Sequence, residues 1–186
     1  AGIVHVSCLA LQAKISVEEA EEKNLRGEAW TERWRRWFTC GLCEQEYHGV
    51  VRCALGWACW KTYVGRPEDD WARRGAINQL GNGLSEAGHH EEALSVQEAE
   101  LSMHRRLGTS GENLLAVQSN LANSYEALGW LEDALRLQRD VYSGYMELKG
   151  EEHSDTLLSA VHYASSLKLL MRHEEARSLL RRTIPV

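Results

Sequence analysis

The sequence predicts an all-α fold in which antiparallel helix hairpins stack into a solenoid, with an atypical helical cap on the N-terminal side. Three observations support this prediction: one motif recurs three times, its large apolar residues follow helical spacing, and a small residue stands at a matching position in each copy. Hydrophobic residues make up 44% and charged residues 26%, which is typical of globular proteins rather than of disordered or collagen-like chains.

Charge and hydropathy narrow the classes of partner. The formal net charge of -6 provides no general attraction for nucleic acid, so we expect no nucleic-acid partner. No apolar run in the sequence is long enough to span a membrane. Residues 1–13 lack the basic segment of a signal peptide. The odd number of 5 cysteines favours an intracellular compartment, the cytoplasm first and an organelle second, over a disulfide framework.

Residues 1–71 are predicted to form the helical cap. An S-x-x-E capping box at Ser16 predicts the start of a helix that runs to about Thr39. Three tryptophans share one face of this helix: Trp30, Trp34 and Trp37. We expect them to pack against the first repeat, with an exposed anchor for a partner as the alternative. Pro67 lies in the turn that precedes the repeats.

A cluster of cysteine and histidine residues in the cap has the spacing C-x2-C-x4-H-x4-C: Cys40, Cys43, His48 and Cys53. This spacing resembles a CCHC zinc knuckle, and the resemblance implies one structural zinc ion held by these four side chains. Alternatively, residues 49–65 match the second helix of a degenerate repeat, and a helix there would bury Cys53 as a reduced thiol. A catalytic cysteine is the third alternative, but spacing alone shows none of the activation that a nucleophile needs.

The repeated motif follows the cap. In each copy two large residues stand four positions apart: Leu80 and Leu84, Leu121 and Tyr125, Tyr163 and Leu167. An alanine follows nine positions later, and the three alanines are 41 and 42 residues apart: Ala93, Ala134 and Ala176. The spacing predicts two helices in each copy, with small residues at their contact and with Gly88 or Gly129 at the turn between them.

These motifs resemble the tetratricopeptide repeat, and the period near 42 residues resembles its kinesin-light-chain type. The resemblance covers about residues 72–186. The predicted units are about 76–115, 116–158 and 159–186, the last of them truncated. Residues 150–157 are similar to the linker that joins such repeats. Three positions depart from the family pattern, which has an aromatic residue at the first two and a small residue at the third: Gln97, Gln138 and Glu100.

The resemblance implies that a protein or peptide binds in a groove lined by the first helices of the repeats. The candidate binding residues are polar and recur at matching positions: Asn78, Asn82, Ser119, Asn123 and Ser165. Amide and hydroxyl groups arranged as a ladder can hydrogen-bond an extended peptide backbone. A solvated polar face without a ligand is the alternative.

We therefore expect a non-enzymatic module that binds a protein partner as part of a larger assembly. The first alternative is a structural subunit fixed in a complex. The second is a zinc-finger adaptor or ligase-type protein with the repeats as its substrate arm. The sequence contains no phosphate-binding loop, paired-carboxylate signature or nucleophile elbow, so we assign no catalytic residues.

Overall fold

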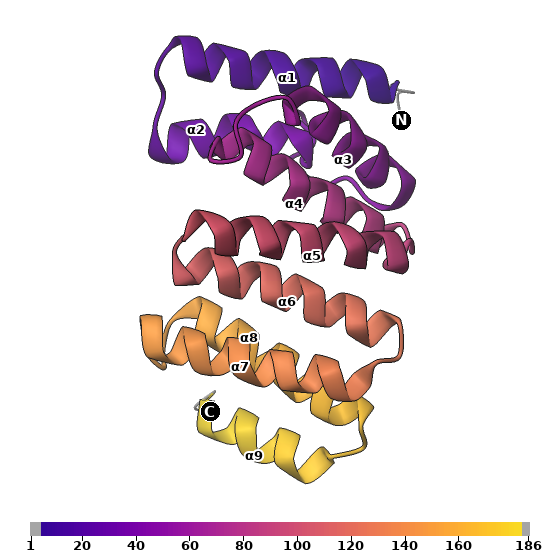
Figure 1. Cartoon of the computed structure of the whole chain (residues 1–186), viewed down its shortest axis with the longest axis vertical. Helices are drawn as coiled ribbons and strands as arrows, with labels where there is room; N and C mark the ends of the chain where they lie inside the picture. Colours follow the sequence, from indigo (N-terminus) through magenta and orange to yellow (C-terminus); the bar gives the residue numbers. More distant parts are fainter. Residues whose placement is uncertain (1–4, 184–186) are drawn as a thin grey trace. The chain divides into compact units, whose positions relative to one another are not determined.

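The computed structural model describes residues 5–183, a part of the chain that consists of helices joined by loops (Figure 1). No β-strand occurs within this range, where an isolated antiparallel bridge pairs Thr39 with Glu46. None of the helices between these limits combines the length and the apolar character that crossing a membrane requires. The predicted all-α fold class is confirmed.

The chain divides into two compact units, which we describe separately. Unit 1 is Ala1–Val96 and unit 2 is Gln97–Val186. Unit 1 contains α1 (Val6–Glu22), α2 (Gly27–Trp34), the 3-10 helix η1 (Arg35–Trp37), α3 (Gly49–Tyr63), α4 (Trp71–Glu86) and the start of α5 (His90–Leu107). Unit 2 contains the rest of α5, α6 (Gly111–Ala127), α7 (Leu131–Lys149), α8 (Ser154–Leu169) and α9 (His173–Thr183). The border expected from the sequence, after residue 71, stays a prediction.

The first helices of unit 1 differ from the sequence prediction. Helix α1 begins at Val6, upstream of the predicted start at Ser16, because apolar residues at helical spacing continue in that direction. Its buried residues are Ala13, Val17 and Ala20. The single helix predicted to run to about Thr39 is wrong, since the chain turns at Asn24. The φ of Asn24 is 50°, a left-handed conformation that asparagine tolerates better than most residues.

Aromatic side chains form much of the core of unit 1. Trp34 stacks on Trp30 with 5.6 Å between ring centroids and meets Trp71 edge-on at 5.0 Å. Trp37 is almost fully buried and meets Tyr63 edge-on at 5.9 Å. Ala72 and Ala76 of α4, the first helix of the repeats, belong to the same buried cluster as Trp34 and Trp37, so the prediction that the tryptophans pack against the first repeat is confirmed.

Helices α3 and α4 form an antiparallel pair whose backbones approach closely at two glycines. A Cβ atom on Gly56 would lie 2.8 Å from the carbonyl oxygen of Gln79. One on Gly83 would lie 2.8 Å from the carbonyl oxygen of Arg52. Helix α4 itself begins after Asp70, whose carboxylate accepts two backbone N–H groups of the first turn. The absence of side chains at the two glycines therefore sets the distance between these helices.

In unit 2 each helix from α6 to α9 packs against the next one along the chain, as stacked hairpins require. Gly129, with φ 80°, ends α6 and donates its N–H to the carbonyl oxygen of Glu126. The small residues predicted at the helix contacts are buried: Ala122, Ala134, Ala164 and Ala176. Residues 184–186 of the third predicted repeat lie outside the described residues.

Candidate functional site

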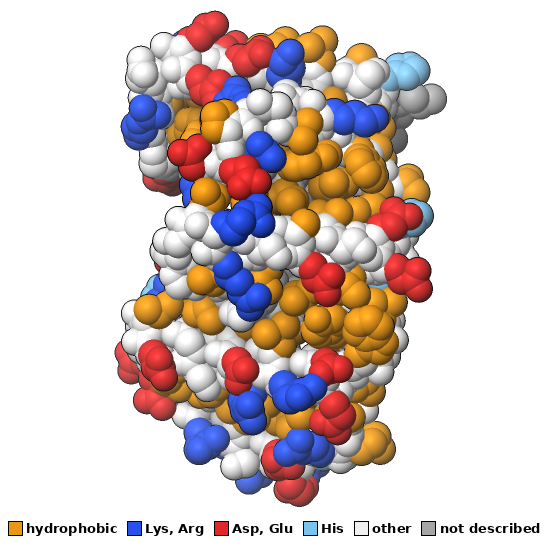
Figure 2. All heavy atoms as spheres, in the orientation of Figure 1, with side chains coloured by type: hydrophobic (Ala, Val, Ile, Leu, Met, Phe, Trp, Pro, Cys, Tyr) orange, Lys and Arg blue, Asp and Glu red, His pale blue; other side chains and the backbone are white. Residues whose placement is uncertain are grey.

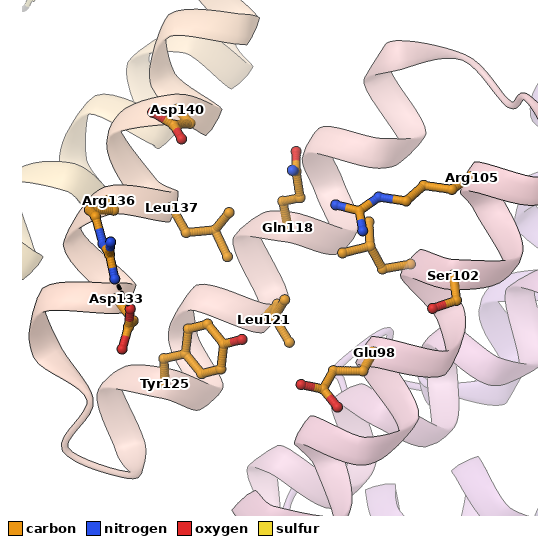
Figure 3. A pocket seen from close by; sticks show the side chains of 11 residues that line it. Glu98, Ser102, Arg105, Gln118, Leu121, Tyr125, Asp133, Arg136, Leu137 and Asp140 are labelled. Carbon is orange, nitrogen blue, oxygen red and sulfur yellow. Dashed lines mark hydrogen bonds and ion pairs between the residues drawn. The ribbon is translucent and has the colours of Figure 1, made fainter.

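An open pocket of about 620 Å³ lies in unit 2 between α5 and α7, with α6 at its base (Figure 3). We call it the α5–α6–α7 groove. Its lining residues are Glu98, Leu101, Ser102 and Arg105 of α5, Gln118, Leu121 and Tyr125 of α6, and Asp133, Arg136, Leu137 and Asp140 of α7. The repeat architecture creates it, because α5 and α7, the second helices of two consecutive repeats, border α6, the first helix of the later repeat.

The base of the groove is apolar. Three leucines form it, two of them buried and one half-buried: Leu101, Leu121 and Leu137. Figure 2 shows hydrophobic side chains at the surface in this region, over α6 and α7. The ring of Tyr125 lies beside the leucines and tilts against exposed Trp130, with 5.5 Å between ring centroids. Burial and, to a lesser degree, the charge of Glu98 raise the pKa of Tyr125, so its hydroxyl stays a neutral donor.

The walls of the groove carry both signs of charge. On α7, Asp133 and Arg136 pair with each other. On α5, Glu98 and Arg105 are both exposed and stand seven residues apart, about two helical turns. Figure 3 shows both of these side chains directed toward the groove. A segment bound there would meet one carboxylate and one guanidinium group along α5.

The predicted peptide-binding residues are distributed over both units. Asn78 and Asn82 lie on α4 in unit 1, half-buried, and the side-chain amide of Asn82 donates to the Asn78 oxygen at 3.1 Å. One donor of Asn82 and the side-chain oxygen of Asn78 are therefore already engaged with each other. The other three residues lie in unit 2, so each unit presents its own part of the predicted ladder.

In unit 2 two of the predicted residues contact neighbouring helices. Ser119 Oγ lies 3.4 Å from His162 Nδ1 on α8, and this contact places α6 beside α8. Asn123 is exposed, and its oxygen accepts a hydrogen bond from the buried amide of Gln138 at 3.0 Å. Ser165 is exposed on α8. Ser119 and Asn123 therefore already take part in contacts between helices.

Apolar residues share this surface of α8. Leu158, Val161 and Leu169 are 55%, 45% and 50% exposed, and with Ser165 they follow spacings of three and four residues along one helix face. We call Ser119, Asn123 and these four α8 residues the α6–α8 face. It is a mixed polar and apolar surface rather than the purely polar ladder that the sequence predicted.

The four predicted zinc ligands do not converge. His48 Nδ1 lies 2.6 Å from Glu86 Oε1, and Cys53 packs against the cluster of Leu80, Leu84 and Ala93. Within residues 5–183, no group of three His, Cys, Asp or Glu side chains lies close enough to hold a metal ion. The side chains as placed therefore do not fit a zinc knuckle, and zinc binding stays a prediction from the spacing.

Cys40 and Cys43 do share one turn, and the surroundings of the Cys40 sulfur favour its thiolate. It accepts the backbone N–H groups of Cys43 and Leu42, then the Cys43 thiol and the Tyr47 hydroxyl, and these bonds lower the pKa of Cys40 to about 7. Burial instead raises the pKa of Cys59. Cys40 is therefore much more easily ionised than Cys59.

The α5–α6–α7 groove was missed by reasoning from the sequence. The sequence identified Leu121 and Tyr125 only as residues of the repeat motif. The structure shows that they also line the groove. A usable signal was present on α5, where the charged residues Glu98 and Arg105 stand seven residues apart on one helix face. Spacing within one helix does not show which other helix stands opposite, so the groove needed the structure.

Comparison with known proteins agrees with this fold. Residues 114–155 match the tetratricopeptide repeat family. The solved structure of BtubC (BKLC) from P. vanneervenii aligns with 97% of this chain and 73% of its own, at a TM-score of 0.62 and 16% identity. A Podosopora anserina protein described as kinesin light chain-like, with nearly identical TPR-like repeats, aligns with 97% of this chain and 95% of its own, at a TM-score of 0.57 and 18% identity.

A single-residue variant of the Podosopora anserina protein aligns with 98% of this chain and 95% of its own, at a TM-score of 0.58 and 17% identity. A comparison with curated proteins found no match. Residues 114–155 are therefore a tetratricopeptide repeat, and the chain has the fold of kinesin light chain-like tetratricopeptide repeat proteins, as the sequence predicted.

Proposed function

We propose that this chain is a non-enzymatic protein-interaction module that binds the apolar face of a partner's amphipathic helix in the α5–α6–α7 groove. The observation that carries the proposal is the groove itself, an open recess with an apolar base, charged walls and a helix along each side. The tetratricopeptide repeat at 114–155 supports a protein-interaction role in general.

The shape and chemistry of the groove favour a helix as its occupant. Two roughly parallel walls with an apolar base form the usual receptor for an amphipathic helix, which places residues i, i+3, i+4 and i+7 into the recess. The leucine base supplies the apolar contact, and the Tyr125 hydroxyl supplies a donor beside it. Because the pocket is open along its length, a chain segment suits it better than an enclosed small molecule.

The charges on α5 select the charged residues along the side of the bound helix. Glu98 and Arg105 are separated by about 10 Å along the α5 axis, from a rise of about 1.5 Å per residue. A partner with a basic and an acidic residue about two turns apart would pair with both at once. Asp140 adds little to this selection, because it already lies 3.2 Å from Arg139. The charged pair therefore fixes the direction of the bound helix.

The α6–α8 face is the competing surface for the same function. Its exposed Leu158, Val161 and Leu169 form an uncovered apolar stripe beside hydroxyl and amide groups. Such a surface suits an extended peptide, whose backbone hydrogen-bonds to the polar groups. The two surfaces differ in the residues they use, so substitution can separate them.

Site-specific photo-crosslinking in extracts of the native source tests the proposal. A photoreactive residue at Ser102 probes the groove, one at Ser165 probes the α6–α8 face, and one at exposed Ser143 on α7 is the control outside both. We expect one partner segment to crosslink from Ser102 and not from Ser143. Crosslinking from Ser165 alone would move the site to the α6–α8 face and contradict the groove.

A synthetic peptide of the crosslinked segment then tests the charge assignment. We expect Glu98→Lys and Arg105→Glu each to raise its Kd about fivefold to tenfold, which corresponds to about 1–1.4 kcal/mol. Glu147→Lys, an exposed position on α7 outside the groove, should leave the Kd unchanged. A peptide with its matching charges reversed should regain affinity for the two groove variants. Equal affinity for all three variants would exclude the proposed orientation.

A further inference from the structure

We propose that Cys40 and Cys43 form a redox-active dithiol that a small anionic disulfide, such as glutathione disulfide, converts to a disulfide within the loop. This site lies in unit 1 and is independent of the proposed protein-binding groove. Three features of the loop favour this chemistry: its geometry, the accessibility of its thiols and the pocket beside them.

The loop holds the two cysteines at a distance that a disulfide can bridge. The Glu44 N–H donates to the Cys40 carbonyl oxygen at 3.0 Å, which closes one tight turn over residues 40–44. Residues i and i+3 of such a turn have Cα atoms less than about 7 Å apart, and disulfides join Cα atoms about 4.4–6.8 Å apart. Oxidation therefore requires little movement of the chain.

The base of the loop is fixed by the backbone. The Cys40 N–H donates to the Gln45 carbonyl oxygen at 2.8 Å, and the Tyr47 N–H donates to the Phe38 carbonyl oxygen at 2.8 Å. These two bonds join the two sides of the loop at its base. The turn is therefore held in place in the reduced protein.

Accessibility distinguishes this pair from the other cysteines. Cys43 is exposed and Cys40 is half-exposed, whereas Cys59 is fully buried and Cys53 packs against the leucines of α4. Cys8 is exposed on α1, but no second cysteine follows it at short spacing. Among the described cysteines, only Cys40 and Cys43 combine access to solvent with a partner thiol on the same turn.

A pocket of about 520 Å³ lies beside the loop, and Cys40 is part of its lining. Arg33 and Arg36 line it as well, together with the apolar side chains of Leu9 and Ile15. Arg36 also donates to the Cys40 carbonyl oxygen at 3.5 Å, which places its guanidinium group at the loop. Glu19 lines the pocket too and lies 3.8 Å from Arg33, and Arg36 lies 3.4 Å from Glu32, so the lining carries two guanidinium groups against one carboxylate. This excess of positive charge next to an accessible thiol favours a disulfide that carries carboxylates.

The reaction is a thiol–disulfide exchange in two steps. The Cys40 thiolate attacks one sulfur of the small disulfide, forming a mixed disulfide and releasing one thiolate, which takes a proton from solvent. The Cys43 thiol, after losing its proton to solvent, then attacks the Cys40 sulfur and displaces the second small thiolate, which is protonated in turn. The two protein thiols lose two electrons in total, and one small disulfide is reduced to two thiols.

Mass spectrometry of the protein equilibrated in buffers of oxidised and reduced glutathione tests the proposal. We expect Cys40 and Cys43 to lose their reactivity toward an alkylating reagent together, with the loss of two hydrogens and no added glutathione. Cys59, alkylated after unfolding, should remain a free thiol. Cys43→Ser should stop at one bound glutathione on Cys40. A wild-type protein that keeps glutathione on Cys40 with Cys43 free would overturn the proposal.

A second comparison tests the pocket. Oxidation by glutathione disulfide should be about fivefold faster than by the cationic disulfide cystamine, and Arg33→Gln should remove most of that preference. Equal rates with the two disulfides in the wild-type protein would overturn the assignment of an anionic substrate. One zinc ion per chain that keeps both thiols unreactive toward glutathione disulfide would overturn the dithiol itself.

Discussion

In unit 1 the antiparallel helices α3 and α4 meet backbone to backbone at Gly56 and Gly83, whereas in unit 2 the hairpins meet through alanines and buried polar side chains. Three of these polar residues are the positions where the sequence departs from the tetratricopeptide pattern. Gln97 accepts from Ser124 at 2.7 Å, Gln138 donates to Asn123 at 3.0 Å, and Glu100 lies 3.9 Å from His104.

The difference shows two ways of specifying the separation of a helix pair. A glycine contact excludes any added atom, so it is sensitive to a single methyl group. A buried hydrogen bond instead requires both of its partners, so it is sensitive to the loss of a donor or an acceptor. Two of the three departures in unit 2, Gln97 and Gln138, therefore have polar partners on α6, whereas Glu100 contacts His104 within α5.

The largest effect is expected from Gly83→Ala. The new Cβ would lie 2.8 Å from the Arg52 carbonyl oxygen, a backbone atom that moves only if α3 moves. Overpacking of a core contact costs about 1–3 kcal/mol and occasionally more. A clash with backbone atoms lies at the upper end of this range, about 3 kcal/mol, and removing a helical glycine returns about 1 kcal/mol, so we expect the free energy of unfolding to fall by about 2 kcal/mol. Urea unfolding followed by tryptophan fluorescence measures it, because six of the 7 tryptophans lie in unit 1.

Gly65→Ala is the matched control. No atom lies within 4 Å of the position that its Cβ would take, so the change in unfolding free energy should stay within about 0.5 kcal/mol. If Gly83→Ala were as stable as Gly65→Ala, the close approach of α3 and α4 would not be a constraint on the fold.

A smaller effect is expected from Ser124→Ala in unit 2. This substitution leaves the buried Gln97 oxygen without the donor that it has at 2.7 Å. We expect a loss of about 1 kcal/mol, the lower end of the cost of an unsatisfied buried acceptor. Adding Gln97→Met should recover most of the loss, because the unsatisfied group is then absent. Amide hydrogen exchange in α6 reports the change locally. Ser165→Ala, on an exposed position, is the control; a double variant less stable than Ser124→Ala alone would contradict the matched-pair interpretation.

The hairpins of unit 2 could be predicted from the sequence because their signals are local. Alanines at fixed spacing and Gly129 at a turn specify a helix pair through contacts close along the chain. The ends of the N-terminal helices could not be predicted, since Ser16 fits a capping box but lies inside α1. Its neighbours continue the apolar face in both directions, and the break depends on the left-handed backbone of Asn24.

The candidate sites show the same limit more strongly. Ser119 and Asn123 were placed on the correct helix, but their partners His162 and Gln138 lie 43 and 15 residues away. Neither pairing follows from the spacing within one motif. The zinc prediction relied on spacing as well. Cys53 in α3 is packed against the α4 leucines, away from the turn that holds Cys40.

The smallest expected effect is on the pH dependence of stability, and it distinguishes two paired cations, Arg66 in unit 1 and Lys149 in unit 2. Arg66 donates to Glu21 at 2.6 and 3.0 Å in unit 1, and Lys149 Nζ lies 2.6 Å from both Asp155 and Glu112 in unit 2. Hydrogen bonds to Asp155 first and Glu112 second raise the pKa of Lys149 above 10.5. A raised folded-state pKa means that the ion pairs stabilise fully below 10.5 and that this contribution is lost as pH rises through the folded value.

Arg66 stays charged over the same range, so its pairing does not titrate. We therefore expect the Tm of Lys149→Met to fall slightly below that of the wild type at pH 8, by a gap that narrows above about pH 11. Lys168→Met, at an exposed position of α8, should change the Tm little at either pH. The gap between wild type and Arg66→Met should stay constant. If the Lys149→Met gap also stayed constant, packing of the lysine stem would account for its effect, and the two cations would be equivalent.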